Sequence, residues 1–206
     1  MGAITKAEFY KLTKFPEVRM IFSLAFLAGL LQGLSPYAGY QVYKVALYPG
    51  ILDAVLISVF TASFVCVEFG NAVLTGASRA HILSAKLAAY FSGLFILLLL
   101  PLFVSVSAAS IRHGFDAGDV SVLPILSQLL FYILYRFFLA GLSVLAAVSI
   151  RNPLGTLGAS AAGIYLVTLL YNPMEKPIIG GTWFDILGIV VSLSLTYFVF
   201  IKRDMT

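Results

Sequence analysis

Charged residues are scarce in this chain. They make up 11% of its 206 residues, whereas hydrophobic residues make up 61%. A soluble globular domain contains about 25% charged and about 45–50% apolar residues. A soluble fold of this length could not bury so much apolar surface. The composition therefore excludes a soluble protein and indicates a polytopic membrane protein.

The motifs of several enzyme classes are absent as well. The sequence contains no Gly-x-x-x-x-Gly-Lys-Ser/Thr, so the chain cannot hold ATP in a P-loop. It contains no His-Glu-x-x-His, which argues against a membrane metalloprotease. The single cysteine, Cys66, cannot form an internal disulfide, and we expect it to be a small buried hydrophobe. We therefore expect no enzyme activity, no metal, no cofactor bound by this chain and no nucleic-acid partner.

Six apolar segments approach the roughly 20 residues that a helix needs to cross a bilayer. They are residues 18–35, 51–69, 84–109, 122–149, 154–171 and 183–201. An open sheet edge cannot be hydrogen-bonded in lipid, so these segments are expected to be helices. The predicted fold is all-α, with six transmembrane helices within residues 18–201.

The basic residues predict an orientation, because an excess of Lys and Arg marks the cytoplasmic side of a membrane. Most of them fall on one side of the six helices: Lys6, Lys11, Lys14, Arg19, Arg79, Lys86, Arg151, Lys202 and Arg203. Both termini are therefore expected in the cytoplasm. An aromatic belt is expected at the outer interface, from Tyr37, Tyr40, Tyr43, Tyr48 and Trp183.

Residues 1–17 precede the first predicted span and have an amphipathic pattern. Ile4, Phe9, Leu12 and Phe15 fall on roughly one side of a helical wheel, and Lys6, Lys11 and Lys14 lie largely opposite. Glu8 interrupts the apolar stripe. We expect an in-plane helix resting on anionic membrane lipid. A disordered tail is the alternative.

The connector between the second and third predicted spans is short, amphipathic and basic. It contains Phe69, Asn71 and Ala72, then Gly76-Ala77-Ser78-Arg79, and then Ile82 and Lys86-Leu87. This pattern resembles the permease subunits of type-2 ABC exporters, especially the small bacterial ones linked to peptide and antibiotic efflux or self-immunity. The predicted six-helix layout resembles that family too. The stretch between Glu68 and Gly76 is short for it.

The resemblance implies that residues 1–206 form one transmembrane permease domain in a bacterial cell membrane, with a cytoplasmic coupling helix at residues 69–83. It also implies that ATP and magnesium bind to two copies of a separate cytoplasmic ATPase, and that a second permease copy completes the pathway.

The chemistry of the connector agrees with a docking role. Gly76 can end one helix, and Ser78 can cap the next. Arg79 offers a planar charged fork to a carboxylate on a partner. The predicted ATPase-coupling residues are Phe69, Asn71, Val73, Leu74, Gly76, Ser78 and Arg79. The alternative is that the connector lies flat on lipid and binds no protein.

Arg136 lies inside the fourth predicted helix, where an unpaired arginine costs at least about 2.5–3.5 kcal/mol. No carboxylate is expected at its depth, so it either contacts substrate or pairs structurally with carbonyls, hydroxyls, water or a second copy. Glu68 ends the second helix, as a solvated carboxylate or as a salt bridge to the coupling helix. Asp53 and Asp185 are expected near outer helix ends, where the helix dipole favours negative charge.

The expected function is export of an apolar or amphipathic substrate, such as a peptide, a drug or a lipid-like molecule, by a permease dimer. Gly29 and Gly33 in the first span, and Gly155 and Gly158 in the fifth, favour close helix packing. An ATP-independent secondary transporter is the alternative, although the buried carboxylates typical of such proteins are not expected here. A non-transporting scaffold or sensor is another. Neither alternative requires an ATPase.

Overall fold

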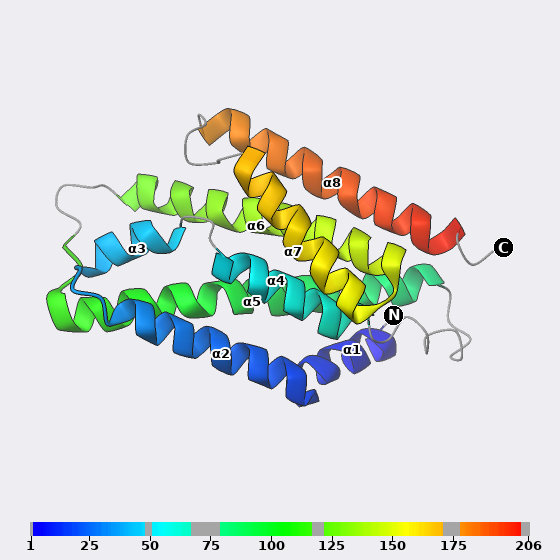
Figure 1. Cartoon of the computed structure of the whole chain (residues 1–206), viewed down its shortest axis with the longest axis horizontal. Coiled ribbons are helices and arrows are strands. Elements are labelled where there is room, and N and C mark those ends of the chain that lie inside the picture. The colour runs from blue at the N-terminus through cyan, green and yellow to red at the C-terminus, as the bar shows by residue number, and fades with distance from the viewer. Residues whose placement is uncertain (1, 48–50, 67–78, 117–121, 171–177, 203–206) are drawn as a thin grey trace.

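The computed structural model describes residues 2–47, 51–66, 79–116, 122–170 and 178–202, and these ranges contain helices and no strand. The helices are α1 (Gly2–Lys14), α2 (Pro16–Gly33), α3 (Gly39–Leu47), α4 (Ile51–Thr61) with the π-helical segment η1 (Ala62–Cys66), α5 (Arg79–His113), α6 (Val122–Ile150), α7 (Pro153–Leu170) and α8 (Ile178–Lys202) (Figure 1). Each of the six predicted apolar segments coincides with one of these helices, so the all-α class is confirmed.

Three of the described helices, α5, α6 and α8, are long and apolar enough to cross a membrane on their own. The number rises to five if the bent pairs α1–α2 and α3–α4 each count as one span, and α7 is a shorter apolar helix. These lengths agree with a multi-pass membrane protein. The sixth span stays a prediction.

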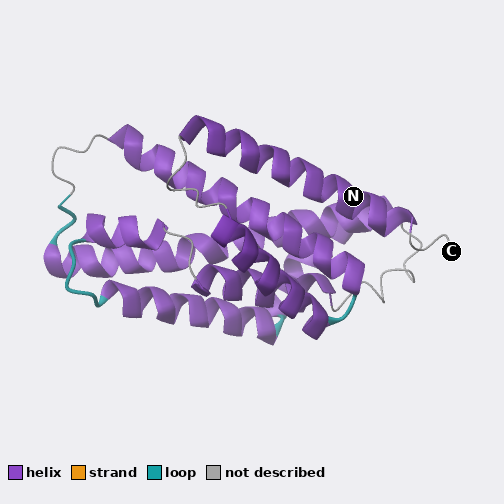
Figure 2. Cartoon of the chain, turned by 45° about the horizontal axis from the view of Figure 1, so that its top comes forward, coloured by secondary structure: helices purple, strands orange, loops and turns teal. Residues whose placement is uncertain are grey.

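The helices run back and forth between the two ends of an elongated bundle (Figures 1 and 2). Helix α1, the start of α5 and the end of α8 lie at one end, which we call the terminal end. Helix α3, the end of α5 and the start of α6 lie at the opposite end. The bend between α1 and α2 is 57°. Pro16 opens α2, at a position where its missing amide hydrogen is tolerated.

Two glycines allow α2 to approach α5 very closely. A Cβ on Gly29 would lie 2.7 Å from the carbonyl oxygen of Pro101, and a Cβ on Gly33 would lie 2.7 Å from the Cβ of Ala108. These glycines were predicted as one possible contact between two copies of the chain. The structure uses them instead to pack two of its own helices.

Helix α3 closes the opposite end of the bundle. The Gly39 amide donates a hydrogen bond to the Gly114 carbonyl (2.9 Å), and the Tyr43 hydroxyl donates to the Ile125 carbonyl (2.6 Å). Tyr40 and Tyr43 are therefore buried against α5 and α6. Tyr37 and Trp183 are exposed, and Tyr48 lies outside the described residues, so the interfacial aromatic belt stays a prediction.

The core of the bundle is apolar and aromatic. The Phe60 ring stacks on the rings of Phe64 and Tyr90, with centroids 5.7 and 5.3 Å away. Tyr90 and Thr61 share a hydrogen bond of 2.7 Å between their hydroxyls. Cys66 is buried beside Thr156, whose hydroxyl lies 3.5 Å from its sulfur, so the prediction of a buried, unpaired cysteine is confirmed.

We predict that Gly29→Ala destabilises the protein and that Gly158→Ala does not. The new methyl group at position 29 would overlap the backbone of α5, and such overpacking costs about 1–3 kcal/mol. A Cβ on Gly158 meets nothing within 4 Å, and alanine favours the helix. Thermal unfolding in detergent measures both variants. Equal midpoints for the two would contradict the close approach of α2 to α5.

Candidate functional site

The predicted coupling residues fall mostly outside the described part of the chain. Glu68, Phe69, Asn71, Val73, Leu74, Gly76 and Ser78 belong to residues 67–78, which the structure does not describe. Arg79 is the first residue of α5. The third predicted helix therefore begins earlier than residue 84, and it ends at His113 rather than at residue 109.

A buried ion cluster lies beside both ends of this connector. The Lys86 ammonium lies 3.8 Å from Glu8 Oε2 and 5.7 Å from the centroid of the Phe64 ring. The Lys11 ammonium lies 3.0 Å from Glu8 Oε1. We call Glu8, Lys11, Phe64 and Lys86 the Lys86 cluster. It joins α1, η1 and α5 at the terminal end, because its members come from these three elements.

Burial was not predicted for either charge of the Lys86 cluster. Lys86 was expected on the cytoplasmic side, and Glu8 interrupts the apolar stripe of α1. Both are buried, at 3% and 6% exposure. Since a buried charge requires an opposite charge nearby, the two residues hold α1 against α5. Helix α1 therefore packs on the bundle through Glu8, which hydropathy alone would place in water.

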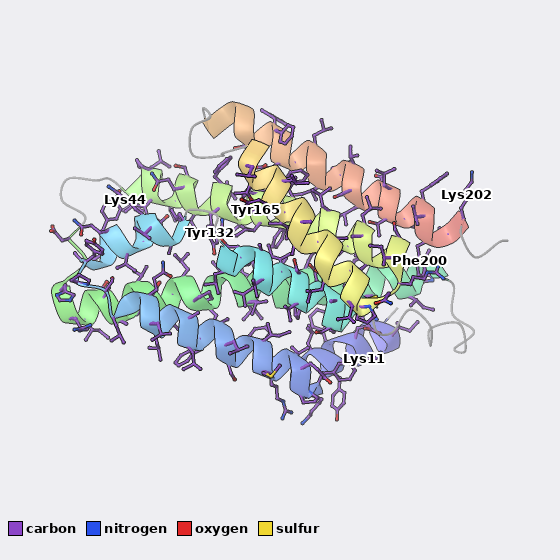
Figure 3. All side chains as sticks on the ribbon, viewed as in Figure 1. Lys11, Lys44, Tyr132, Tyr165, Phe200 and Lys202 are labelled. Atoms are coloured by element: carbon purple, nitrogen blue, oxygen red, sulfur yellow. The ribbon has the colours of Figure 1, made fainter. Side chains whose placement is uncertain are left out.

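A second ion cluster lies deeper in the bundle. Arg136, at 1% exposure, donates from Nη2 to Asp53 Oδ2 at 2.7 Å and from Nε to Asp53 Oδ1 at 3.0 Å. The Tyr132 ring covers the guanidinium, with its centroid 3.3 Å from Cζ. We call Asp53, Tyr132 and Arg136 the Arg136 cluster. Figure 3 shows Lys11 near the terminal end and Tyr132 farther along the bundle.

The Arg136 cluster connects three helices. Asp53 comes from α4, and Tyr132 and Arg136 come from α6. The Tyr132 hydroxyl donates a hydrogen bond of 3.2 Å to the Leu98 carbonyl of α5. Paired, two-point hydrogen bonding between a guanidinium and a carboxylate is among the strongest polar contacts in proteins. The arrangement thus fixes the positions of α4, α5 and α6 relative to one another.

The expectation that Arg136 has no carboxylate at its depth was wrong. Asp53 was predicted to lie at the start of its helix, and it does lie in the first turn of α4, but it also pairs with Arg136. The missed signal is a simple one. An arginine in an apolar helix needs a counter-charge, and Asp53 is the acidic residue of the neighbouring apolar helix α4.

Asp185 is a third buried ionisable site, and it differs from the two ion clusters. Its exposure is 0%, and neither carboxyl oxygen has a hydrogen-bond partner among the described residues. It lies within α8, which begins at Ile178, so its expected place at a helix start was wrong. The hydroxyls of Tyr135, on α6, and Thr168, on α7, lie 3.3 Å apart.

The described residues contain no group of three or more His, Cys, Asp and Glu side chains that could hold a metal ion. Comparisons of the chain with protein-family models, with curated proteins and with solved structures found no match. Function must therefore be inferred from the buried charges and from the pattern of the sequence.

We predict that removing either partner of the Arg136–Asp53 pair is more harmful than removing both. Asp53→Asn leaves an unpaired buried arginine, and Arg136→Gln leaves an unpaired buried carboxylate, each at a cost of about 3–5 kcal/mol. In the double variant neither charge remains, so its unfolding midpoint should lie above those of both single variants. Strictly additive losses in thermal unfolding would contradict the pairing.

Proposed function

We propose that this chain is the membrane-spanning permease subunit of an ATP-driven exporter whose ATPase is a separate cytoplasmic protein. The observation that carries the proposal is the Lys86 cluster. It joins α1, η1 and α5 where the chain enters and leaves the connector, and the connector's sequence resembles the coupling region of type-2 ABC exporters.

The Lys86 cluster gives the connector a mechanical link to the bundle. A force that a docked ATPase exerts on residues 67–78 would act directly on Cys66 at the end of η1 and on Arg79 at the start of α5. Lys86 lies two turns into α5 and is paired with Glu8, so α1 would move with α5. Separating the pair would take the Glu8 carboxylate away from the buried Lys86 ammonium, which favours movement of the three elements together.

Helix α5 can carry this movement across the bundle. It contains 35 residues and is thus about 50 Å long at 1.5 Å per residue. Its far end holds α3 through the Gly39 to Gly114 hydrogen bond, and it holds the end of α2 through Arg112, which donates to the Leu34 carbonyl at 3.0 Å. A displacement at the terminal end would therefore be transmitted to α3 at the opposite end.

The terminal end has room for movement. A largely apolar groove of about 480 Å³ lies between Phe15 and Pro16 at the bend, η1 and the start of α7. Another, of about 300 Å³, lies between Phe9 and Leu12 of α1 and the neighbouring parts of α2 and α5. Close-packed helices resist relative motion, whereas grooves at the bend allow α1 and α2 to change their angle.

A second permease copy is part of the proposal, and α7 is the helix best suited to meet it. The glycines of α2 pack within the chain, whereas α7 presents a group of exposed small residues. Gly155, Gly158, Ala159 and Ala162 are exposed, and Gly158 has open space beside it. Small residues at such spacings allow close approach of membrane helices. The substrate we propose is apolar or amphipathic, such as a peptide, a drug or a lipid-like molecule.

An ATP-independent secondary transporter is the second candidate. It was disfavoured because no carboxylate was expected in mid-membrane, whereas Asp185 is buried and Asp53 is partly buried in its pair with Arg136. Intramembrane carboxylates are typical of ion-coupled transporters. The two candidates differ in their need for an ATPase.

We predict that Arg79→Glu abolishes docking of the ATPase. The change would turn a cation that can pair with a carboxylate on the ATPase into an anion that repels it. The measurement is retention of the ATPase on the tagged permease, together with ATP hydrolysis by the complex. Lys6→Glu is the matched control, because Lys6 is exposed at the same end of the bundle. Wild-type retention and hydrolysis for Arg79→Glu would refute the docking role.

We predict that Glu8→Gln weakens the coupling between the permease and the ATPase without separating the two proteins. The variant removes the counter-charge of Lys86, costs about 1–3 kcal/mol of stability and frees α1 from α5. ATPase retention should persist, while the effect of the permease on the rate of ATP hydrolysis should fall several-fold. Glu17→Gln is the control, since Glu17 is exposed at the start of α2. Unchanged hydrolysis in Glu8→Gln would contradict transmission through the Lys86 cluster.

A further inference from the structure

The carboxyl group of Asp185, in α8, is completely buried. Neither of its oxygens has a hydrogen-bond partner among the described residues. Its surroundings are apolar. The ring of Phe138 meets that of Phe184, the neighbour of Asp185, with centroids 5.8 Å apart, and it also packs against Gly188 one turn farther along α8. An ionised carboxylate in such a place would lose its hydration and gain nothing in return. The group must therefore be neutralised.

Three means of neutralisation are open to a buried carboxylate: a basic side chain, a metal cation or a proton. Arg136 is already held by Asp53 through two hydrogen bonds. A metal cation needs several oxygen ligands, and the described residues offer no cluster of acidic, histidine or cysteine side chains around Asp185. A proton needs only the carboxyl group itself.

We propose that Asp185 is a proton-binding site within the bundle, occupied in the conformation seen here. When α8 moves away from α6 and water enters, the O–H bond of the carboxyl group breaks and the proton passes to that water, leaving a hydrated carboxylate. Proton binding at Asp185 therefore favours the closed packing of α8 on α6, and release accompanies its opening. The site is independent of the proposed ATP-driven function, because a secondary transporter could use it equally.

The groups around Asp185 agree with this assignment. The ionisable groups of α6, which packs against α8, are Tyr132, Tyr135 and Arg136, and Arg136 is paired with Asp53 of α4. Helix α7 contributes Thr168, whose hydroxyl is paired with that of Tyr135. The charged residues of α5 lie toward its two ends. Because Asp53 compensates Arg136, these groups leave no surplus positive charge for an ionised Asp185.

Infrared spectroscopy of the full chain in lipid nanodiscs tests the site directly, because a protonated carboxyl group has a C=O stretching band that an ionised one lacks. At pH 7, where an aspartate in water is ionised, the wild type should show this band. Asp185→Asn should remove it, and Asp116→Asn should leave it, since Asp116 is exposed to water. Aspartate labelled with ¹³C at the carboxyl carbon should shift the band in the wild type, which assigns it to an aspartate without any substitution.

Thermal unfolding provides an independent readout. Asparagine resembles a protonated aspartate in shape and charge, so Asp185→Asn should keep or raise the midpoint, whereas Asp53→Asn should lower it. A wild type with no protonated-carboxyl band at pH 7 overturns the proposal. So does a band that ¹³C-aspartate does not shift, or one that appears only when sodium and potassium are removed, which would indicate a bound cation. A loss of stability in Asp185→Asn equal to that in Asp53→Asn would also overturn it.

Discussion

The cost of burying an arginine in an apolar bundle is the constraint on which this structure depends. Arg136 is almost fully enclosed, and it would be unfavourable there without a carboxylate in two-point contact. Asp53 provides that contact from α4, and Tyr132 covers the guanidinium while bonding to α5. The apolar contacts of membrane helices are only weakly directional, so this one cluster gives α4, α5 and α6 a defined relative position.

The same physics acts at two other places, with different results. At the terminal end, Lys86 and Glu8 compensate each other and thereby attach α1 to α5 beside the connector. In α8, Asp185 has no such partner among the described residues. A proton is the counter-charge that fits its apolar surroundings. The first arrangement is suited to transmitting force from a docked protein. The second is suited to reporting whether α8 is packed or open.

Hydropathy predicted the all-helical class and placed each long helix well, because apolar length decides whether a segment can lie in a bilayer. It failed for residues whose burial depends on a single contact between segments that are far apart in the sequence. Glu8 and Lys86 are buried only because they meet, and Arg136 is buried because it meets Asp53, which lies far away in the sequence. The α2 glycines look equally suited to a second copy or to a neighbouring helix, and only the fold shows that Pro101 lies opposite Gly29. Helix α3 was not predicted from the sequence, because its tyrosines resemble interfacial residues. In the structure, the Tyr43 hydroxyl donates a hydrogen bond to the Ile125 carbonyl.

This chain is proposed to work as the membrane half of a complex with a separate ATPase. Native mass spectrometry of the tagged permease, purified from its own cells in mild detergent, tests this most directly. Two permease copies with two copies of an ATP-hydrolysing protein are expected. A permease that purifies from those cells without any ATPase, yet moves substrate in proteoliposomes lacking ATP, would contradict it.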